Sequence, residues 1–457
     1  MSYQLPENFF FGGAMSGPQT EGKWQDGGKL PNLWDTWSNL DIHAFHNRVG
    51  SYAGNDFTER MEDDLQLLKS LGMDSIRTSI QWSRLLDING NLNPEGEKYY
   101  HHLFAVAKKV GIEIFVNLYH FDMPEYLFNR GGWESREVVE AYAHYARIAF
   151  ETFGKEIRYW FTFNEPIVEP EVRYTLGGWY PFVKNYSRAR AVQYNISLAH
   201  ALGVREYRRA KAAGFMLEDS RIGLINCFAP PYTKENPSEA DLEALRMTDG
   251  VNIRWWLDLV TKGELPQDVI DTLQTRGVDL PIRPEDKLIL ADGVVDWLGC
   301  NYYHPERIQA PAKDTDENGI PNFADPYIWP EAEMNVSRGW EIYPQGLYDF
   351  AMKVRDEYPE LEWFVSENGM GVEREDLKKD ENGVIQDDYR VILSGLLVQF
   401  RTAQNAVVIT TGPSSITGPG QMPLRTVMAL LRLTWKITTT VVLRNQLSGL
   451  STLPLHI

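Results

Sequence analysis

The chain has 457 residues, of which 43% are hydrophobic and 12% are aromatic, so it is long enough to bury a large globular core. Its formal net charge of −18 disfavours nucleic acid and anionic membranes as partners, because long-range repulsion opposes both. The two cysteines, Cys227 and Cys300, are too few for a disulfide framework or a metal cluster, so we interpret both as buried, unreactive thiols and expect neither metal nor cofactor.

The first residues, MSYQLPENFFFGGAMSG, lack the basic start, the long apolar segment and the small-residue cleavage site of a secretory signal. No later run approaches about 18 uninterrupted apolar residues, which is close to the length that a membrane-spanning helix needs. We therefore expect a cytoplasmic protein that does not insert into membranes.

Short runs of β-branched and aromatic residues alternate with helical patterns along the chain. Seven runs are expected to be strands, at residues 8–14, 75–82, 113–119, 159–165, 221–228, 297–303 and 362–367. Helical patterns, such as residues 56–71 and 135–153, lie between them. Nearly continuous apolar strands joined by helices indicate a parallel sheet covered by helices, and this number of units indicates a closed barrel. The sequence thus predicts the α/β class and a single (β/α)8 TIM barrel.

Polar side chains gather where the expected strands end. Residues 159–166 (YWFTFNEP) are the clearest case, because a mostly apolar run ends in Asn164 and Glu165 and is stopped by a proline. The carboxyl ends of barrel strands share one face, on which loops build the active site. Six of the seven strand ends carry groups that bind hydroxyls or move protons, namely Gln19 and Glu21, Arg77, His120, Asn164 and Glu165, Asn301 and Tyr303, and Glu367.

These side chains favour chemistry on a polyol. They form no ligand set dense enough for zinc, and no glycine-rich phosphate loop or G-x-S-x-G elbow precedes a helix in the sequence. Two carboxylates on separate strands, Glu165 and Glu367, can flank a glycosidic bond. A separation of about 5 to 5.5 Å would make the reaction a double displacement, with one acid/base and one nucleophile.

The surroundings of the two carboxylates predict different roles. Glu165 follows an aromatic strand, and such surroundings raise a carboxyl pKa and keep a proton available for the leaving oxygen. Glu367 must stay ionised, and Arg77 and the Tyr303 hydroxyl are suitable partners for its charge. Taken singly, a glutamate at a strand end more often caps a helix or faces solvent. The coincidence of so many groups at one face favours the catalytic interpretation.

These motifs resemble glycoside hydrolase family 1. Residues 162–166 (TFNEP) resemble its acid/base motif and residues 365–369 (VSENG) its nucleophile motif. Further blocks follow the order of the family, at residues 10–14 (FFGGA), 18–22 (PQTEG), 76–84 (IRTSIQWSR), 120–124 (HFDMP) and 299–303 (GCNYY). The resemblance implies a retaining β-glycosidase in which Glu165 is the acid/base and Glu367 the nucleophile. The residues expected to bind substrate are Gln19, His120, Asn164 and Trp340, and those expected to support the nucleophile are Arg77, Asn301 and Tyr303.

Within that family the chain resembles bacterial cytoplasmic enzymes that hydrolyse 6-phosphorylated β-glycosides. Residues 120–124 and 339–347 (GWEIYPQGL) carry this resemblance. It implies a small phosphorylated β-glucoside as the substrate, with 6-phospho-β-glucosidase favoured over 6-phospho-β-galactosidase. A β-glucosidase for unphosphorylated substrates and a non-catalytic product that keeps the carboxylates are the alternatives.

The character of the chain changes after residue 390. Residues 391–457 contain no Asp or Glu, although the preceding 390 residues contain all 63, and they contain only two aromatic residues, Phe400 and Trp435. The family would end in an eighth strand followed by Trp, Asp-Asn and Arg-Tyr-Gly motifs, and none is present. We therefore expect strands one to seven of the glycosidase barrel in residues 1–390, and an aberrant tail in residues 391–457 in place of the last barrel unit.

A frameshift between about residues 391 and 404 is our hypothesis for this tail. Codons for residues 408–412 (VITTG) can encode Gly-Tyr-His-His-Trp one base earlier, and those for residues 425–429 (RTVMA) can hide Arg-Tyr-Gly. We expect the adjacent frame of the encoding DNA to contain these motifs, whereas stop codons there would indicate a genuinely divergent tail. Loss of the eighth strand would leave unpaired edges and would remove the Ser, Lys and Tyr that bind the 6-phosphate in the phospho-specific subfamily.

Overall fold

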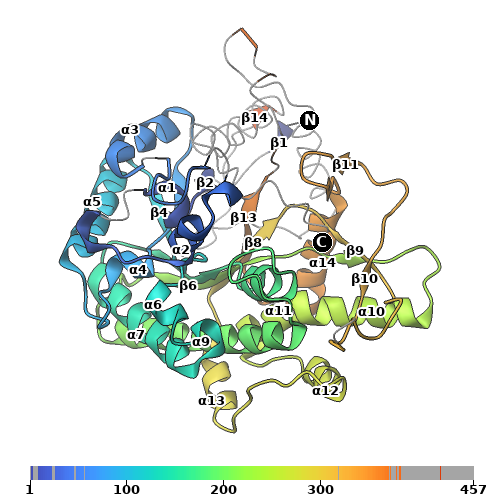
Figure 1. Cartoon of the computed structure of the whole chain (residues 1–457). Coiled ribbons are helices and arrows are strands. Elements are labelled where there is room, and N and C mark those ends of the chain that lie inside the picture. Colours follow the sequence, from blue (N-terminus) through green and yellow to red (C-terminus); the bar gives the residue numbers. More distant parts are fainter. Residues whose placement is uncertain are drawn as a thin grey trace.

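Seven parallel strands form the centre of the fold (Figure 1). The computed structural model describes residues 2–3, 9–22, 26–45, 48–55, 57–316, 319–369, 371, 377, 380–381 and 422–423. The strands follow the order β13-β8-β6-β5-β4-β3-β2. Their bounds are β2 Gly12–Ala14, β3 Ser75–Ser79, β4 Glu113–Tyr119, β5 Tyr159–Asn164, β6 Arg221–Cys227, β8 Trp297–Tyr302 and β13 Trp363–Asn368. All seven predicted strands are therefore confirmed, although the first two are shorter than expected.

The sheet curves into a nearly closed barrel. β2 and β13, at the two ends of the strand order, contact each other. Side chains from opposite walls also meet inside, since the rings of Phe10 and Tyr159 lie 6.0 Å apart and those of Phe115 and Phe364 are separated by the same distance. In the described part of the chain no further strand pairs with β2 or β13.

Helices cover the outer side of the barrel and alternate with its strands (Figure 1). Their bounds are α1 Gly17–Thr20, α2 Leu33–Leu40, α3 Phe57–Ser70, α4 Trp82–Leu85, α5 Pro94–Val110, α6 Glu125–Phe128, α7 Arg136–Phe153, α8 Val168–Pro170, α9 Tyr186–Ala212, α10 Glu239–Asp249, α11 Trp255–Lys262, α12 Gln267–Thr275, α13 Asp286–Leu290 and α14 Gln345–Glu357. The helices predicted at residues 56–71 and 135–153 are confirmed as α3 and α7.

Local sequence explains where a typical outer helix begins and ends. The Asn93 side chain accepts a hydrogen bond from the Glu95 backbone N–H, and Pro94 occupies the first turn of α5, where its missing N–H costs nothing. Gly111 ends the same helix in a left-handed conformation, with φ of 79°, which glycine adopts without a steric penalty. The chain then enters β4 directly, so α5 and β4 form one barrel unit.

An aromatic cluster fills the interior of the barrel. Its buried members are Phe115, Tyr159, Phe161, Ile225 and Trp297, and Phe10 and Phe364 pack against them. The Trp297 ring stacks on Phe364 with centroids 4.5 Å apart. This inner cluster is separate from the larger core between sheet and helices, so the barrel is packed rather than hollow, and polar groups can gather only beyond the cluster.

Several short strands lie outside the barrel. They are β1 Ser2–Tyr3 with β14 Met422–Pro423, the sheet β10 Asp325–Pro326, β9 Glu306–Gln309 and β7 Pro231–Tyr232, and the pair β11 Met334–Asn335 and β12 Trp340–Glu341. The predicted aberrant tail at residues 391–457 lies outside the described residues, except for the two residues of β14. Its frameshift origin stays a prediction.

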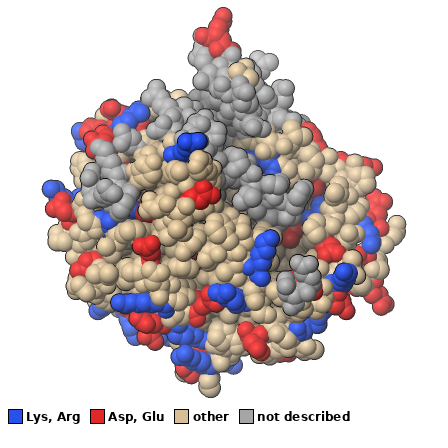
Figure 2. All heavy atoms as spheres, viewed as in Figure 1, with Lys and Arg blue, Asp and Glu red and all other residues tan. Residues whose placement is uncertain are grey.

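Two observations bear on the partners that the sequence disfavours. None of the described helices is long and apolar enough to cross a membrane. On the face seen in Figure 2, acidic and basic side chains are interspersed among the coloured residues rather than gathered by sign. Such a face offers no continuous basic surface for a nucleic acid backbone.

Candidate active site

An irregularity at the end of β13 turns Glu367 toward the barrel interior. Phe364 belongs to the inner aromatic cluster and Val365 packs against the outer core, as alternation along a strand requires. The pairing register with β8 then shifts between Val365 and Glu367. Because such a bulge holds one extra residue, Ser366 and Glu367 both contact groups of the barrel interior.

A second irregularity at the end of β5 presents Asn164 and Glu165. Phe161 lies in the inner aromatic cluster, whereas Thr162 and Phe163 both face the outer helices. The register with β6 shifts between Phe161 and Asn164, so Asn164 contacts the interior again. Glu165 follows with a φ of 47°, a left-handed conformation that is uncommon for a residue other than glycine and that often marks functional sites.

Glu367 lies between a cation and a hydroxyl. Its Oε1 forms an ion pair with Nη2 of Arg77, and its Oε2 accepts a hydrogen bond from the Tyr303 hydroxyl. Arg77 is buried in β3, with 4% of its surface exposed, and Tyr303 directly follows β8. Both contacts stabilise the ionised form of the carboxyl group. They are the two residues that the sequence suggested as partners for the charge of Glu367.

Glu165 lies in a different environment. The side chain is half-buried, and its Oε1 accepts a hydrogen bond of 2.7 Å from Nδ2 of Asn301. Burial raises the pKa of the Glu165 carboxyl, while the Asn301 hydrogen bond and the Arg77 charge oppose this rise. Glu165 therefore retains its proton to a higher pH than an exposed glutamate does. Asn301 was expected beside Glu367, but its direct carboxylate contact is with Glu165.

His120 and Asn164 extend this network. Nη1 of Arg77 donates a hydrogen bond of 2.8 Å to Oδ1 of Asn164, whose Nδ2 lies 3.0 Å from Nε2 of His120. Burial and the nearby Arg77 charge lower the pKa of His120 well below its ordinary value. The ring is therefore neutral at physiological pH, so Nε2 can accept the hydrogen bond from Asn164.

Two further predicted residues lie at the same end of the barrel. Trp340 in β12 is half-buried, and its ring is 5.4 Å from that of Tyr303 and 5.1 Å from that of His304. Gln19 lies on α1, directly after β2. Within the described part of the chain no hydrogen bond joins the Gln19 side chain to the network, so the geometry groups Trp340 with the carboxylates more directly than Gln19.

Asp122 is a site residue that the sequence did not reveal. Its two carboxyl oxygens accept hydrogen bonds of 3.0 Å from the backbone N–H groups of His120 and Trp82. It thereby fixes the backbone that carries His120. Burial raises the pKa of Asp122 to about 7. The available signal was only an aspartate two residues after a histidine at a strand end.

Glu21 has a similar supporting role beneath α1. Its Oε2 accepts hydrogen bonds from Nε2 of Gln81 at 2.6 Å and from Nε of Arg84 at 2.7 Å, and its Oε1 accepts one from the Tyr100 hydroxyl. These contacts are buried and fasten the end of α1, on which Gln19 lies. The strand-end position of Glu21 was noted from sequence, but its partners show a supporting function rather than a group aimed at substrate.

The cysteines show no sign of reactivity. Cys300 is buried in β8 and Cys227 is half-buried at the end of β6. Burial raises the pKa of both thiols well above their ordinary value, so both stay protonated at neutral pH. The described residues contain no cluster of His, Cys, Asp and Glu that could hold a metal ion.

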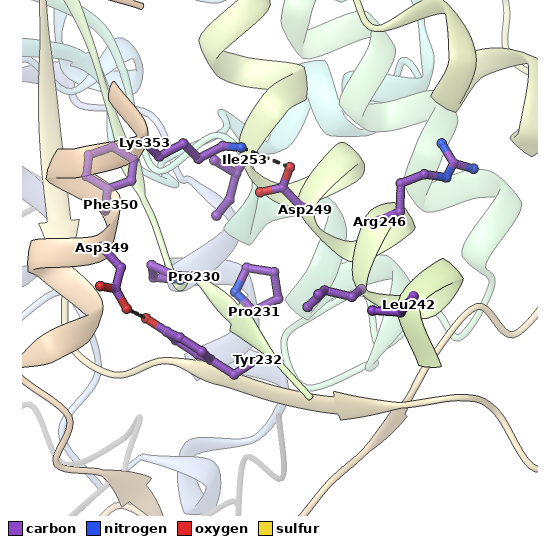
Figure 3. Close-up of a pocket in the computed structure, with 11 residues that line it drawn as sticks. Pro230, Pro231, Tyr232, Leu242, Arg246, Asp249, Ile253, Asp349, Phe350 and Lys353 are labelled. Carbon is purple, nitrogen blue, oxygen red and sulfur yellow. Dashed lines mark hydrogen bonds and ion pairs between the residues drawn. The ribbon is translucent and has the colours of Figure 1, made fainter. Parts of the chain in front are cut away.

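A pocket of about 350 Å³ lies apart from the carboxylates, between α10, the short helix Gly250–Arg254 and α14 (Figure 3). Pro230, Leu242, Leu245, Ile253 and Phe350 supply its apolar lining. Its charged groups already have partners, including Lys353 with Asp249 at 3.3 Å. None of the residues predicted for the active site lines this pocket, so we place the candidate site at the strand ends.

Comparisons with known proteins identify the family to which the chain belongs. The model of a family described as Glycosyl hydrolase family 1 matches residues 1–405. The chain is 39% identical over 393 residues to 6-phospho-beta-glucosidase GmuD of Bacillus subtilis, covering 85% of this chain and 83% of that protein. It is 33% identical over 416 residues to a 6-phospho-beta-galactosidase of Leptotrichia buccalis, covering 86% and 85%. A solved beta-glucosidase from Exiguobacterium marinum matches with a TM-score of 0.76 and 28% identity, covering 88% and 87%.

Proposed function

Because this chain belongs to glycosyl hydrolase family 1, and is accordingly an O-glycosyl hydrolase, we propose that it cleaves 6-phospho-β-D-glucosides with retention of configuration at the anomeric carbon. Glu367 is the proposed nucleophile and Glu165 the proposed acid/base. The substrate is a small glycoside, and the proposed mechanism needs only the side chains of the protein and a water molecule.

The reaction proceeds in two displacements. In the first, the carboxylate of Glu367 attacks the anomeric carbon while Glu165 donates its proton to the departing glycosidic oxygen. The product is a covalent glycosyl ester of Glu367. In the second, Glu165 accepts a proton from water, which attacks the same carbon and releases Glu367. His120, Asn164, Gln19 and Trp340 are proposed to hold the sugar during both steps.

The contrast between the two carboxyl groups is the observation that supports these roles most strongly. Glu367 contacts a guanidinium and a hydroxyl, which favour its ionised form, whereas burial raises the pKa of Glu165. Pairs of carboxyl groups whose environments separate their pKa values are characteristic of acid and nucleophile pairs. The Arg77 charge acts on both groups, which is consistent with their proposed positions across one bond.

The proposed preference for a 6-phosphate rests on the sequence motifs and on the similarity to two phosphoglycosidases. The Ser, Lys and Tyr that bind the phosphate in the phospho-specific subfamily follow the eighth strand, and residues 391–457 contain none of the family motifs expected there. A 6-phospho-β-galactosidase remains the alternative within the class, because the same similarities include one.

If the chain keeps two charge-assisted hydrogen bonds to the phosphate, we expect kcat/KM for p-nitrophenyl β-glucoside 6-phosphate to exceed that for unphosphorylated p-nitrophenyl β-glucoside by at least about 100-fold. Release of p-nitrophenol by the purified chain measures both values. Equal rates would indicate a plain β-glucosidase, and faster turnover of the galactoside 6-phosphate would indicate the other epimer. A cooperative thermal unfolding transition without turnover of any of these substrates would favour the non-catalytic alternative.

A further inference from the structure

The Asn301 amide connects the strand of one carboxylate with the strand of the other. It is fully buried, with 0% exposure, on β8. Its Nδ2 donates to Oε1 of Glu165 at 2.7 Å and lies 3.3 Å from Oδ1 of Asn164. On its other side, Oδ1 accepts a hydrogen bond of 2.7 Å from the Ser366 hydroxyl. Every polar atom of this buried amide therefore has a partner.

The partners of Asn301 determine which way its amide points. Arg77 donates to Oδ1 of Asn164, so that oxygen can only accept hydrogen bonds from its neighbours. The atom of Asn301 that faces Asn164 and Glu165 must therefore be Nδ2. This leaves Oδ1 on the opposite side, where the Ser366 hydroxyl satisfies it. Without that hydroxyl, a buried carbonyl oxygen would lose its hydrogen bond and the amide could turn or shift.

Two features of the backbone bring Ser366 to this position. The bulge in β13 lets Ser366 and Glu367 both contact interior groups. Glycine at position 299 leaves the necessary room, because a Cβ there would lie 2.8 Å from Oγ and 3.1 Å from Cβ of Ser366. The hydroxyl is thus accommodated by the neighbouring strand.

We infer that Ser366 is a positioning residue for Glu165, acting through Asn301. This inference rests on the proposed function, in which Glu165 is the acid/base. Ser366 directly precedes the proposed nucleophile, yet its hydrogen bond leads to the other carboxyl group. A hydroxyl on β13 therefore stabilises the hydrogen bond that the acid/base receives on the opposite side of the site.

The remaining ionisable groups near Glu165 come from three other elements. They are Arg77 from β3, Cys227 from β6 and Tyr303 after β8. In the described part of the chain none of them is hydrogen-bonded to the Ser366 hydroxyl, which donates to Asn301. Removal of Oγ should therefore act on Glu165 through the Asn301 amide, because the charges around the carboxyl group stay in place.

The variant Ser366→Ala tests this inference, with Ser366→Thr as the matched control that keeps a hydroxyl. The full chain is assayed with methyl 6-phospho-β-glucoside, whose leaving group needs a proton, and with p-nitrophenyl 6-phospho-β-glucoside, whose leaving group needs little. For the methyl substrate we expect Ser366→Ala to lower kcat/KM by about 3- to 10-fold, the scale of one hydrogen bond. The aryl substrate should lose less, and Ser366→Thr should restore the activity.

The pH profile of kcat/KM supplies the second readout. In Ser366→Ala the basic limb should move to higher pH, because a weaker hydrogen bond from Asn301 stabilises the Glu165 carboxylate less. The acidic limb, which is assigned to Glu367, should stay in place. Titration of the substrate phosphate affects the pH profiles of parent and variant equally. An unchanged basic limb, a shifted acidic limb, or a Thr variant that behaves like the Ala variant would overturn the inference. If Glu165→Gln slowed both substrates equally, the proposed acid/base role itself would fail instead.

Discussion

Replacing Glu367 with alanine is expected to lower kcat for p-nitrophenyl 6-phospho-β-glucoside by at least about 10⁴-fold, the scale on which loss of a covalent nucleophile reduces turnover. The carboxylate is proposed to form the bond to the anomeric carbon, and neither Arg77 nor Tyr303, its two contacts, can replace it as the attacking group. Without the ester intermediate, double displacement cannot begin.

Covalent labelling separates this role from a structural one. A 2-deoxy-2-fluoro-β-glucoside 6-phosphate with a dinitrophenyl leaving group should add one fluorosugar phosphate to the parent chain, and peptide mass spectrometry should place the label on Glu367. The variant should remain unlabelled. Equal labelling of parent and variant would assign the nucleophile to another residue.

Glu362→Ala is a suitable control for the effect of removing a glutamate from this strand. Glu362 directly precedes β13 at its opposite end, and its side chain is 57% exposed in an ion pair with Arg221. Such exposed ion pairs contribute little to stability. This control should therefore keep both turnover and labelling.

Replacing Glu165 with glutamine is expected to slow methyl 6-phospho-β-glucoside by about 10²- to 10⁴-fold, and the activated p-nitrophenyl substrate far less. Glutamine keeps the shape of the side chain and can still accept the hydrogen bond from Asn301, so the site remains assembled. It cannot donate a proton to the leaving oxygen, however, and a poor leaving group depends on that proton.

The rates of hydrolysis of the methyl and p-nitrophenyl substrates by parent and variant test this role. The basic limb of the pH profile should also disappear, because in the parent it reports loss of the proton from Glu165, whose pKa is raised by burial. Glu140→Gln, an exposed replacement on α7, should leave both rates unchanged. Equal slowing of both substrates by Glu165→Gln would remove the acid assignment.

Much of the barrel follows from patterns in the sequence, because its strands are nearly continuous apolar runs ending in polar groups. The orientations of the side chains at the ends of β5 and β13 do not follow from these patterns. Simple alternation from Phe161 would turn Asn164 toward the helices, and alternation from Phe364 would do the same to Glu367. In the structure a bulge in each strand turns Asn164 and Glu367 toward the interior instead. No residue type in these segments predicts the bulges.

The hydrogen bonds that hold the site residues in place could also not be predicted from the spacing of residues in the sequence. Asp122 acts through backbone N–H groups from two separate segments, one of them 40 residues distant. Asn301 contacts Glu165, which is 136 residues away in the sequence. From the sequence, Asn301 had instead been grouped with the residues that support Glu367. Such pairings depend on which strands are adjacent and on the register between them.

The inner aromatic cluster bears on the order in which the glycoside enters the proposed site and the products leave it. Rings contributed from β4, β5, β8 and β13 fill the barrel below the carboxylates, so among the described residues the proposed substrate would reach them from the strand-end side. The esterified sugar would then lie deepest, behind the departing alcohol. In the proposed mechanism, water would reach that ester after the alcohol has left, so the packed interior would keep the two half-reactions apart in time.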